Sequence, residues 1–397
     1  MLKKASGTRP AFKLPRTVYI VICVFPAVLA LLFYVLRSNT GLMSWFAVRI
    51  SSPVRGVLGL FSTIYPLSLM EILCAAAAVW LIYYIVRTVM ATVRRRDKLK
   101  ILSKRLLTIA VAALYVWSAY CWLWNVGYFA HSFAANNGFS PGGVTTAELT
   151  AVTRLFAEKA NEFAPLVKRD AEGHCIEDRR EFFAASTSIY DNMFSEFPGL
   201  GGRLYRPKSM LFSWLMSRTG YTGIYFALTG ESNINTNTPA FSMPSVVAHE
   251  LAHQRGVYRE DEANFVGIAA CVTSGNPVYE YSGWLSGLMY LCGALSQADR
   301  EAWVGVVLSL SEEVNTDWQD NHDFWQSQKM FDTGVKIVDK VLTATTGTVS
   351  EAVDTVYDSF LRSHNQELGL RSYGACVDLL VQYFSMNDGQ WTIDNGQ

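Results

Sequence analysis

Three long apolar segments near the N-terminus constrain the fold of this chain more than any other feature. The first is an uncharged run over residues 17–36, the second spans residues 67–86 with a single charge at Glu71, and the third covers residues 106–129. As a helix, each is about long enough to cross the hydrocarbon core of a bilayer. The first run is long for a cleaved signal peptide, and no small-x-small site clearly follows it, so we expect a retained helix. The sequence therefore predicts three transmembrane helices.

The charges divide the chain into two parts. Residues 1–127 contain 16 Lys and Arg and two acids, whereas residues 128–397 contain 18 Lys and Arg and 32 acids. Thirteen basic residues lie before residue 17 or between residues 87 and 105, and only three lie between the first two apolar segments. The positive-inside rule predicts a cytoplasmic N-terminus, a cytoplasmic loop near residues 94–105 and an extracytoplasmic part after residue 130. Nucleic acid is not an expected partner, because the positive charge lies beside apolar runs and not on a folded basic face.

We divide the chain into a membrane anchor over residues 1–130 and an extracytoplasmic domain over residues 131–397. Glu71 lies near the outer end of its segment, where we expect its carboxylate to reach water. Only 17% of the residues are charged and half are hydrophobic, which excludes a disordered chain.

The second part reads as α+β with helices dominating. A capping-box pattern at Thr145 and Glu148 begins a helix that runs to about residue 167. A short aromatic segment at residues 223–228 predicts a strand, and the polar residues 231–239 after it predict a loop. Helical patterns cover residues 178–197, 209–218, 244–255, 260–273, 278–296, 299–313, 320–344, 349–363 and 372–386.

One motif in the second part carries chemistry. Residues 249–253 read HELAH, so His249 and His253 share one face of a helix and can both reach a single metal ion. Glu250 lies beside that face, where its carboxylate can take a proton from a water molecule at the metal. The alternative is a pair of structural histidines beside a salt-bridged glutamate. Catalytic zinc also needs a third protein ligand and an open position.

The segment EDEAN, at residues 260–264, supplies candidates for the third ligand. Gly256 allows the chain to turn back toward the metal. Glu260 shares a helix face with Asn264 and Gly267, whereas Glu262 is rotated from Glu260 by about 200°. We favour Glu260 as the ligand over Glu262. We expect Gly267 to permit close helix packing and Asn264 to bond the second nitrogen of a histidine.

At these residues the sequence resembles the gluzincin metallopeptidases, in which HExxH is followed by a helix carrying ExxxN or ExxxD. The block from residues 222–235 through HELAHQRG and EDEANF, together with RSYGACVDLL at residues 371–380, resembles an uncharacterised family of bacterial membrane-anchored HExxH proteins. This resemblance covers most of the chain. It implies a metallopeptidase-like fold with one zinc ion, but no substrate. The short gap between His253 and Glu260 departs from most gluzincins and requires a tight turn.

We therefore expect a membrane-anchored zinc metallopeptidase. Strand 223–228 is a candidate for pairing with an extended peptide substrate, although an ordinary sheet edge has the same pattern. A donor for the developing oxyanion is expected among Tyr373, Arg371, His364 and His322, with Tyr373 preferred. Two other functions stay open, namely a zinc-binding sensor that cleaves nothing and an interaction protein of the cell envelope.

Four cysteines lie in the second part, at positions 175, 271, 292 and 376. An extracytoplasmic domain permits disulfides, but the spacing identifies no pair. Cys271 and Cys292 lie in helical apolar patterns and are expected in the core.

Overall fold

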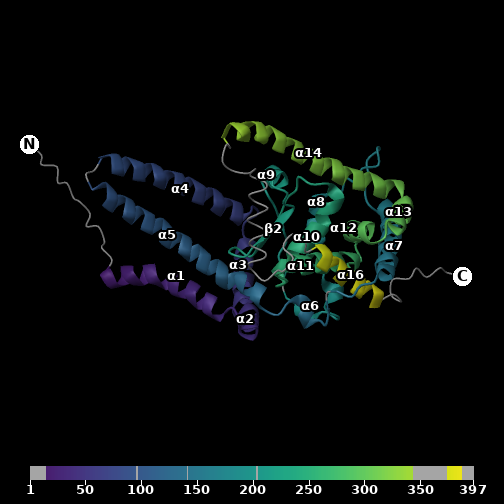
Figure 1. Ribbon diagram of the computed structural model, residues 1–397, viewed down its shortest axis with the longest axis horizontal. Coiled ribbons are helices and arrows are strands. Elements are labelled where there is room, and N and C mark those ends of the chain that lie inside the picture. The colour runs from purple at the N-terminus through teal and green to yellow at the C-terminus, as the bar shows by residue number, and fades with distance from the viewer. Residues whose placement is uncertain (1–14, 95–96, 141, 203, 343–372, 387–397) are drawn as a thin grey trace, which may run out of the picture.

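The computed structural model describes residues 15–94, 97–140, 142–202, 204–342 and 373–386. The molecule is elongated, with three long helices at one end and a helical domain with a small sheet at the other (Figure 1). Within these described residues, three helices are long and apolar enough to span a membrane, namely α1 (Arg16–Leu36), α4 (Leu69–Arg94) and α5 (Lys98–Leu123). The prediction of a mainly helical α+β fold with a small sheet and three N-terminal helices that can span a membrane is confirmed.

The limits of two membrane helices differ from the prediction. α4 continues past the expected end at residue 86, and α5 begins at Lys98 instead of residue 106, because Lys and Arg are good helix formers where a helix leaves the membrane. α5 ends at Leu123, and the 3₁₀ helix η2 (Asn125–Phe129) follows it. Val126 and Tyr128 of η2 are buried against the domain. The aromatic end of the third apolar run is therefore part of the protein core.

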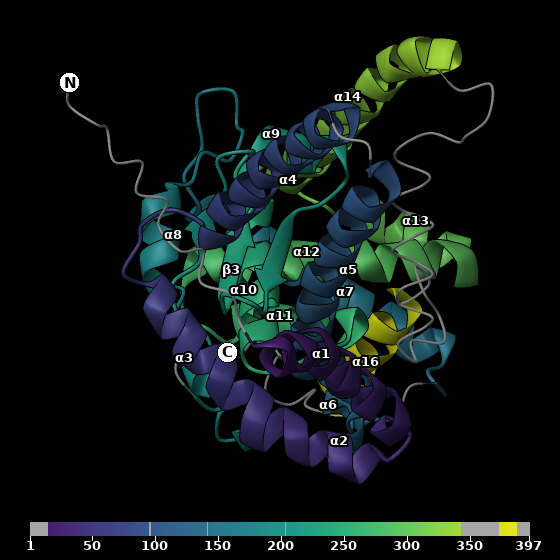
Figure 2. The same ribbon diagram turned by 90° about the vertical axis from the view of Figure 1, so that its left-hand side faces the viewer.

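The connection between α1 and α4 is folded. It contains α2 (Thr40–Phe46), the π-helix η1 (Ala47–Ser51) and α3 (Ser52–Ser62). Seen from the membrane end, these helices pass beside the three-helix bundle (Figure 2). We call residues 37–68 the juxtamembrane segment. Its Arg55 is buried, although the positive-inside count treated it as a loop residue.

The domain holds the first turn of α4. Glu231 accepts hydrogen bonds from the backbone N–H groups of Leu69 and Met70, each at 3.1 Å. These are two of the N–H groups that a helix cannot satisfy by itself. Lys208 pairs with Glu231 and also donates to the carbonyls of Ser62 and Leu67. The anchor and the domain are therefore tied together by buried polar groups.

The prediction that Glu71 reaches water is wrong. Its side chain is 6% exposed, and its two carboxylate oxygens accept the N–H groups of Leu211 and Phe212, each at 2.9 Å. The Glu71 carboxylate can be buried near the membrane surface because backbone N–H groups replace water as its hydrogen-bond partners. A contact so distant in sequence leaves no local pattern.

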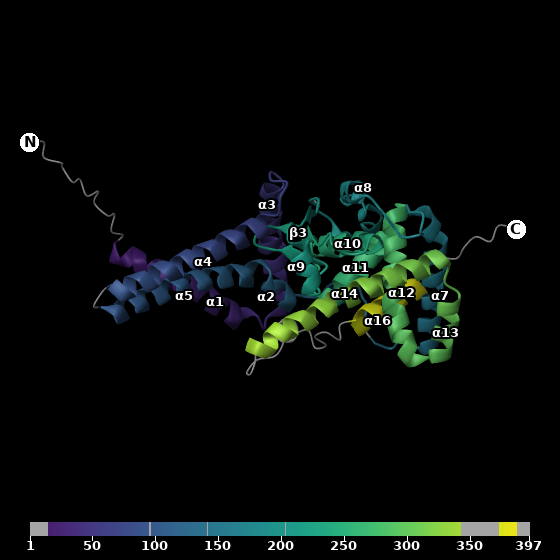
Figure 3. The ribbon, with the colours of Figure 1, turned by 90° about the horizontal axis from the view of Figure 1, so that it is seen from above.

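Three helices lie at the centre of the domain and contribute many of its core residues, namely α10 (Met243–Gln254), α11 (Glu260–Val272) and α12 (Pro277–Ala298). Figure 3 shows α7 (Thr146–Phe163) and α16 (Tyr373–Met386) beside α12. Phe156, Trp284 and Phe384 form an aromatic contact where α7, α12 and α16 meet. The other helices of the domain are α6 (Phe133–Asn136), η3 (Ala164–Leu166), α8 (Arg179–Ala185), η4 (Asp191–Met193), η5 (Pro198–Leu200), α9 (Ser213–Arg218), η6 (Ala240–Ser242), α13 (Arg300–Leu308) and α14 (Glu312–Leu342).

The sheet has three strands in the order β1-β3-β2. β1 (Lys208–Ser209) pairs in parallel with β3 (Glu231–Ile234), and β2 (Gly223–Phe226) pairs antiparallel to β3. The predicted strand is therefore present and lies at an edge. The predicted loop at 231–239 is wrong in its first half, because β3 is the central strand. All four β3 residues are buried, and Ser232 donates to the carbonyl of Glu250 at 2.9 Å.

Several other predicted helices differ from the structure. The expected helix at 178–197 is the short α8, after which the chain continues in turns and 3₁₀ helices. The expected helix at 209–218 is divided between β1 and α9. The capping box at Thr145 and Glu148 is confirmed at the start of α7. The predicted helix at 349–363 lies outside the described residues.

The cysteines form no disulfide in the part of the chain that the structure describes, which includes all seven. Cys271 and Cys292 are buried in the main core, as predicted.

Candidate metal centre

Helix α10 carries the HELAH motif. Pro244 lies in its first turn, where the missing N–H costs nothing. Val247, Ala248, Leu251 and Ala252 are fully buried in the domain core. Because these residues fix one side of α10 against the core, the side chains of His249 and His253 are held on the other side.

The end of α10 sets the orientation of His253. Gly256 has a φ of +87°, its N–H donates to the carbonyl of His253 at 3.1 Å, and the N–H of Val257 donates to Ala252 at 3.1 Å. This is a Schellman ending, which glycine favours because it adopts positive φ without strain. The turn brings the Val257 carbonyl to 2.7 Å from His253 Nδ1. Since a carbonyl only accepts, Nδ1 is the donor and Nε2 is left available to a metal.

Helix α11 packs closely against α10 at Gly267. A Cβ atom on Gly267 would lie 2.8 Å from the backbone nitrogen of His249. The predicted role of Gly267 in close helix packing is confirmed. This approach brings Glu260, the first residue of α11, next to the two histidines.

The side chains of His249, His253 and Glu260 converge. The Oε2 atom of Glu260 lies 3.2 Å from His249 Nε2 and 3.5 Å from His253 Nε2. The three potential metal-ligand atoms, one from each residue, all lie within 4.8 Å of one another. Two ligands at about 2.0–2.1 Å on a tetrahedral zinc ion are about 3.3 Å apart. Charge-assisted hydrogen bonds are shorter, at about 2.7–2.9 Å. The separations therefore fit three ligands of one metal ion.

The environment of Glu260 suits a ligand. Burial would raise the pKa of its carboxyl group, but the neighbouring side chains of His253 and His249 outweigh burial and hold the pKa well below its usual range. The carboxylate is therefore ionised and able to bind a cation. The side chains of Glu260 and His249 are 22% and 18% exposed, so a small ligand can reach the group.

Glu262, the competing glutamate, has a different place in the structure. Its two carboxylate oxygens accept the N–H groups of Phe133 and Ala134, each at 2.9 Å. These groups lie at the start of α6, so Glu262 stabilises a helix N-terminus. Both carboxylate oxygens therefore have partners on α6, away from the histidines.

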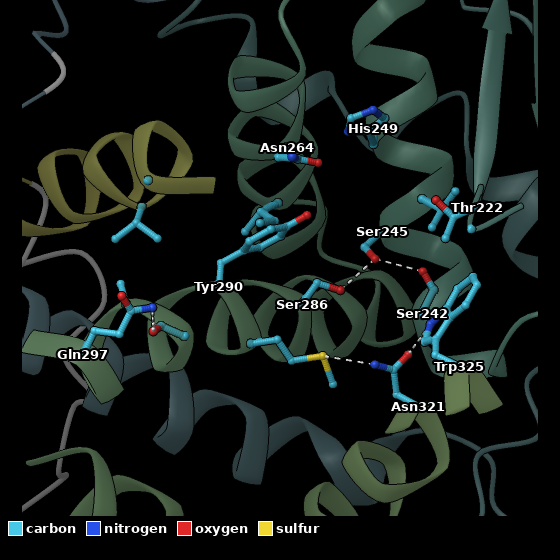
Figure 4. Close-up of a pocket in the computed structure, with 18 residues that line it drawn as sticks. Thr222, Ser242, Ser245, His249, Asn264, Ser286, Tyr290, Gln297, Asn321 and Trp325 are labelled. Carbon is cyan, nitrogen blue, oxygen red and sulfur yellow. Dashed lines mark hydrogen bonds between the residues drawn. The ribbon is translucent and has the colours of Figure 1, made fainter. Parts of the chain in front are cut away.

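The expected role of Asn264 is not found in the described residues. Nδ1 of His253 is bonded to Val257, and Nδ1 of His249 is buried with no hydrogen-bond partner. The helix ending of α10 supplies the partner that we expected from α11. Asn264 instead lines the cleft beside His249 (Figure 4).

Glu250 lies in a dry and confined position. It is 3% exposed, and its Oε2 atom has no hydrogen-bond partner in the described part of the protein. Burial is the main cause that raises the pKa of Glu250 to about 8, and the charge of His249 and the N–H of Tyr225 oppose that rise. A Cβ atom on Gly223 would lie 2.5 Å from Glu250 Oε1. Strand β2 therefore passes directly beside this carboxylate.

Sequence reasoning missed Arg55, which reaches the site from the juxtamembrane segment. Its guanidinium donates to the carbonyl of His253 at 3.1 Å and to the hydroxyl of Tyr258 at 2.8 Å. It also lies over the rings of Trp124 and Tyr225, with 5.5 Å to each ring centroid. No local pattern marks a lone arginine, in a loop counted only for its charge, as a neighbour of a histidine 198 positions later.

A cleft of about 1200 Å³ borders the metal centre. Figure 4 shows His249 and Thr222 at one end of it and polar side chains along its length. Ser245 and Ser286 are bonded hydroxyl to hydroxyl at 2.8 Å. α14 contributes Trp325, and the residues after Tyr373 in α16 also contribute to the wall. The volume of the cleft is large enough for a peptide-sized ligand next to His249, and its lining contains several polar side chains.

Among the four predicted oxyanion donors, the structure describes the side chain of His322 alone. His322 is exposed on α14 and does not line the cleft. Tyr373 begins α16, but its side chain is not described. Arg371 and His364 lie outside the described residues.

A family model described as "Protein of unknown function (DUF3810)" matches residues 46–381. The chain belongs to this family. The DUF3810 match begins in α2 and ends in α16, so it includes Arg55, two of the candidate membrane helices and the group formed by His249, His253 and Glu260. The predicted membership of an uncharacterised family is thus confirmed. The family description names no metal and no peptidase, so the resemblance to gluzincins stays a prediction. No curated protein and no solved structure matches the chain.

Proposed function

We propose that this DUF3810 protein is a membrane-anchored zinc metallopeptidase of gluzincin type. The observation that carries the proposal is the convergence of His249, His253 and Glu260, with the buried carboxylate of Glu250 on the same helix. Three protein ligands and an open position are the arrangement of catalytic zinc, whereas structural zinc usually has four protein ligands. A structural site also has no use for Glu250.

Each side chain has a stated role in this proposal. His249, His253 and Glu260 hold one zinc ion, which when bound supplies a Lewis acid and lowers the pKa of a water molecule. Glu250 accepts the proton of that water as the general base and delivers it to the leaving amine. The carbonyl of Val257 accepts a hydrogen bond from His253 Nδ1 and orients the imidazole ring. Arg55 donates to the backbone carbonyl of His253 and holds this end of α10 in place.

The edge of β2 that is not paired with β3 is the proposed binding site for the substrate backbone. The N–H of Asn235 donates to the carbonyl of Thr222 at 2.9 Å. Because bonded residues alternate along an antiparallel pair, Gly223 and Tyr225 direct their backbone groups away from β3. That edge faces Glu250, and Thr222 at its start lines the cleft. An extended peptide that adds to this edge would pass beside the metal centre.

The proposed location is a cell membrane, with the N-terminus in the cytoplasm and the domain outside. The domain lies at the end of the bundle opposite to the start of α1, the end of α4 and the start of α5 (Figure 1). Basic residues gather at that opposite end, which by the positive-inside rule is cytoplasmic.

The test compares the wild type with Glu250→Gln, reconstituted in lipid vesicles, on an unbiased peptide library. We expect cleavage by the wild type only, while zinc content and thermal stability are the same in both. The glutamine keeps the shape of the side chain but cannot take a proton, so chemistry is lost and binding is not. If the wild type cuts nothing, or if Glu250→Gln retains full activity, the peptidase function is wrong. A wild type that holds zinc but cuts nothing would favour the sensor.

A further inference from the structure

A group of large apolar side chains projects from the domain next to the membrane. Leu211, Phe212, Trp214 and Leu215 are 63%, 50%, 49% and 49% exposed. They lie in and just before α9, and we call these four residues the α9 apolar surface. The opposite side of this segment is packed, since Met210 and Met216 are buried together with Met70 of α4. α14 also contacts α9, but these four side chains keep about half or more of their surface exposed.

The depth of this surface relative to the membrane is set by hydrogen bonds. Glu71, in the first turn of α4, accepts the N–H groups of both Leu211 and Phe212 at 2.9 Å. The apolar stretch of α4 begins at Leu69, in that same turn. The α9 apolar surface therefore lies at the level where α4 enters the bilayer.

Two further observations indicate the same level. The guanidinium of Arg218 lies 5.0 Å from the centroid of the Trp214 ring. Tryptophan and arginine together are typical of the headgroup region, where the ring body is in the apolar layer and the cation is in the wet layer. On the other side of α4, the end of the juxtamembrane segment exposes more apolar residues, namely Leu60, Phe61, Ile64, Tyr65 and Leu67. Figure 2 shows α9 and α3 on different sides of α4.

The same segment leads directly to the cleft. α9 ends at Arg218, and Gly220 and Thr222 already line the cleft beside His249. One end of the cleft is thus only a few residues from the side chains that lie at the membrane level.

We infer that the α9 apolar surface inserts into the lipid headgroup region, and that the cleft therefore takes peptide segments held at the membrane surface. Large exposed apolar groups next to a membrane span are satisfied by lipid, as in monotopic proteins. The substrate class is then a polypeptide tethered to the same membrane, whose segment near the bilayer reaches the cleft. This substrate class rests on the proposed function, whereas the insertion does not.

The insertion is tested with a nitroxide label on Leu215→Cys. The background replaces the three accessible cysteines, Cys23, Cys74 and Cys175, by serine, and the full chain is reconstituted in vesicles of phosphatidylcholine and phosphatidylglycerol. The control label is at Leu308→Cys, which is 81% exposed on α13, at the far end of the domain (Figure 1). Electron paramagnetic resonance compares collision of each label with oxygen, which enters lipid, and with a water-soluble nickel chelate. We expect the label at 215 to prefer oxygen and the label at 308 to prefer nickel. A label at 215 that meets nickel as readily as the control overturns the insertion.

The substrate class is tested by offering one cleavable sequence in two forms, as a soluble peptide and as a peptide with a lipid anchor in the same vesicles. We expect kcat/KM for the anchored form to be at least about 10-fold higher. Leu215→Glu should lower this ratio and leave cleavage of the soluble peptide unchanged, because Leu215 contributes nothing to the metal centre. Equal cleavage of both forms by the wild type overturns the substrate class. If neither form is cut while the label at 215 lies in lipid, the peptidase function is wrong and the insertion is supported.

Discussion

Glu260 and Glu262 both lie in the first turn of α11 but point to different sides of this helix, and this difference decides which of them faces the histidines. The rotation of about 200° was readable from sequence spacing. The Glu260 carboxylate lies 3.2 Å from His249 Nε2, whereas the Glu262 carboxylate accepts a hydrogen bond from the N–H of Phe133 at the start of α6. The partner of His253 Nδ1 was not readable, because it is a backbone carbonyl. Spacing along a helix predicts which side chains lie on the same face. It does not predict which backbone groups of the following turn will bond those side chains.

We predict that Glu260→Gln weakens zinc binding strongly, whereas Glu262→Gln leaves zinc near one per chain. Only the first removes a charged ligand. Glu262→Gln should instead lower the thermal stability, because Phe133 and Ala134 lose a charged partner for their N–H groups. Zinc is measured by competition with a chelator, and stability by thermal unfolding in detergent. Loss of zinc in Glu262→Gln but not in Glu260→Gln would show that the assignment is reversed.

Arg55 is predicted to position the metal centre from outside it. Arg55→Met removes the donors to the His253 carbonyl and the Tyr258 hydroxyl. We expect zinc affinity to fall by about 10- to 100-fold, the range for residues that orient a ligand. Arg55→Lys keeps the positive charge, so its zinc affinity should lie between those of the wild type and Arg55→Met. The control is Arg49→Met, an exposed arginine of the same segment. Equal zinc affinity in Arg55→Met and Arg49→Met would contradict this role.

At the scale of elements, the close packing of α10 and α11 creates the centre. Gly267→Ala would place a Cβ atom 2.8 Å from the backbone of His249, so the helices must separate. We expect a loss of about 1–3 kcal/mol in the free energy of unfolding, as for other overpacked interiors, and weaker zinc binding.

Gly293→Ala is the matched control, since its Cβ meets nothing within 4 Å and alanine favours helices. It should leave the melting temperature unchanged or slightly higher. If both alanine variants retain wild-type stability and zinc affinity, then close packing at Gly267 does not hold the centre together.

The elements that sequence reasoning found and missed differ in what their polar residues do. α10, α11 and α12 show apolar periodicity along their buried sides and were predicted within a few residues. β3 was missed because its four buried residues are ESNI, which read as polar. Their partners are Lys208, the first turn of α4 and the backbone of Glu250, all distant in sequence. A strand stabilised by buried polar contacts has no hydrophobic pattern to detect.

At the scale of the whole molecule, the anchor and the domain form one structure. The sequence suggested a boundary at residue 130, since the charge and hydropathy change there. However, Arg55 donates a hydrogen bond to the carbonyl of His253, and Glu231 accepts one from the N–H of Leu69 at the start of α4. Trp124, at the end of α5, packs its ring against His253 with 5.4 Å between centroids. The change in composition predicts where the membrane-spanning part of the chain ends. It does not predict which residues of that part pack against the domain.

The proposed orientation is tested on membrane vesicles of both orientations. Protease outside right-side-out vesicles should digest the part of the chain after residue 130 and spare the basic loop near residues 94–105. Inside-out vesicles should give the reverse result, because the basic residues lie on the cytoplasmic side. If the part after residue 130 is protected in right-side-out vesicles, the orientation is wrong.

The central claim is that His249, His253 and Glu260 hold one zinc ion, and zinc K-edge X-ray absorption of the purified full-length protein tests it most directly. We predict one zinc per chain, with only nitrogen and oxygen neighbours at about 2.0–2.2 Å and the scattering of two imidazole rings. The same spectrum in Glu250→Gln is expected, because Glu250 is not a ligand. Zinc well below one per chain, or sulfur neighbours at about 2.3 Å from the cysteines, would contradict the account.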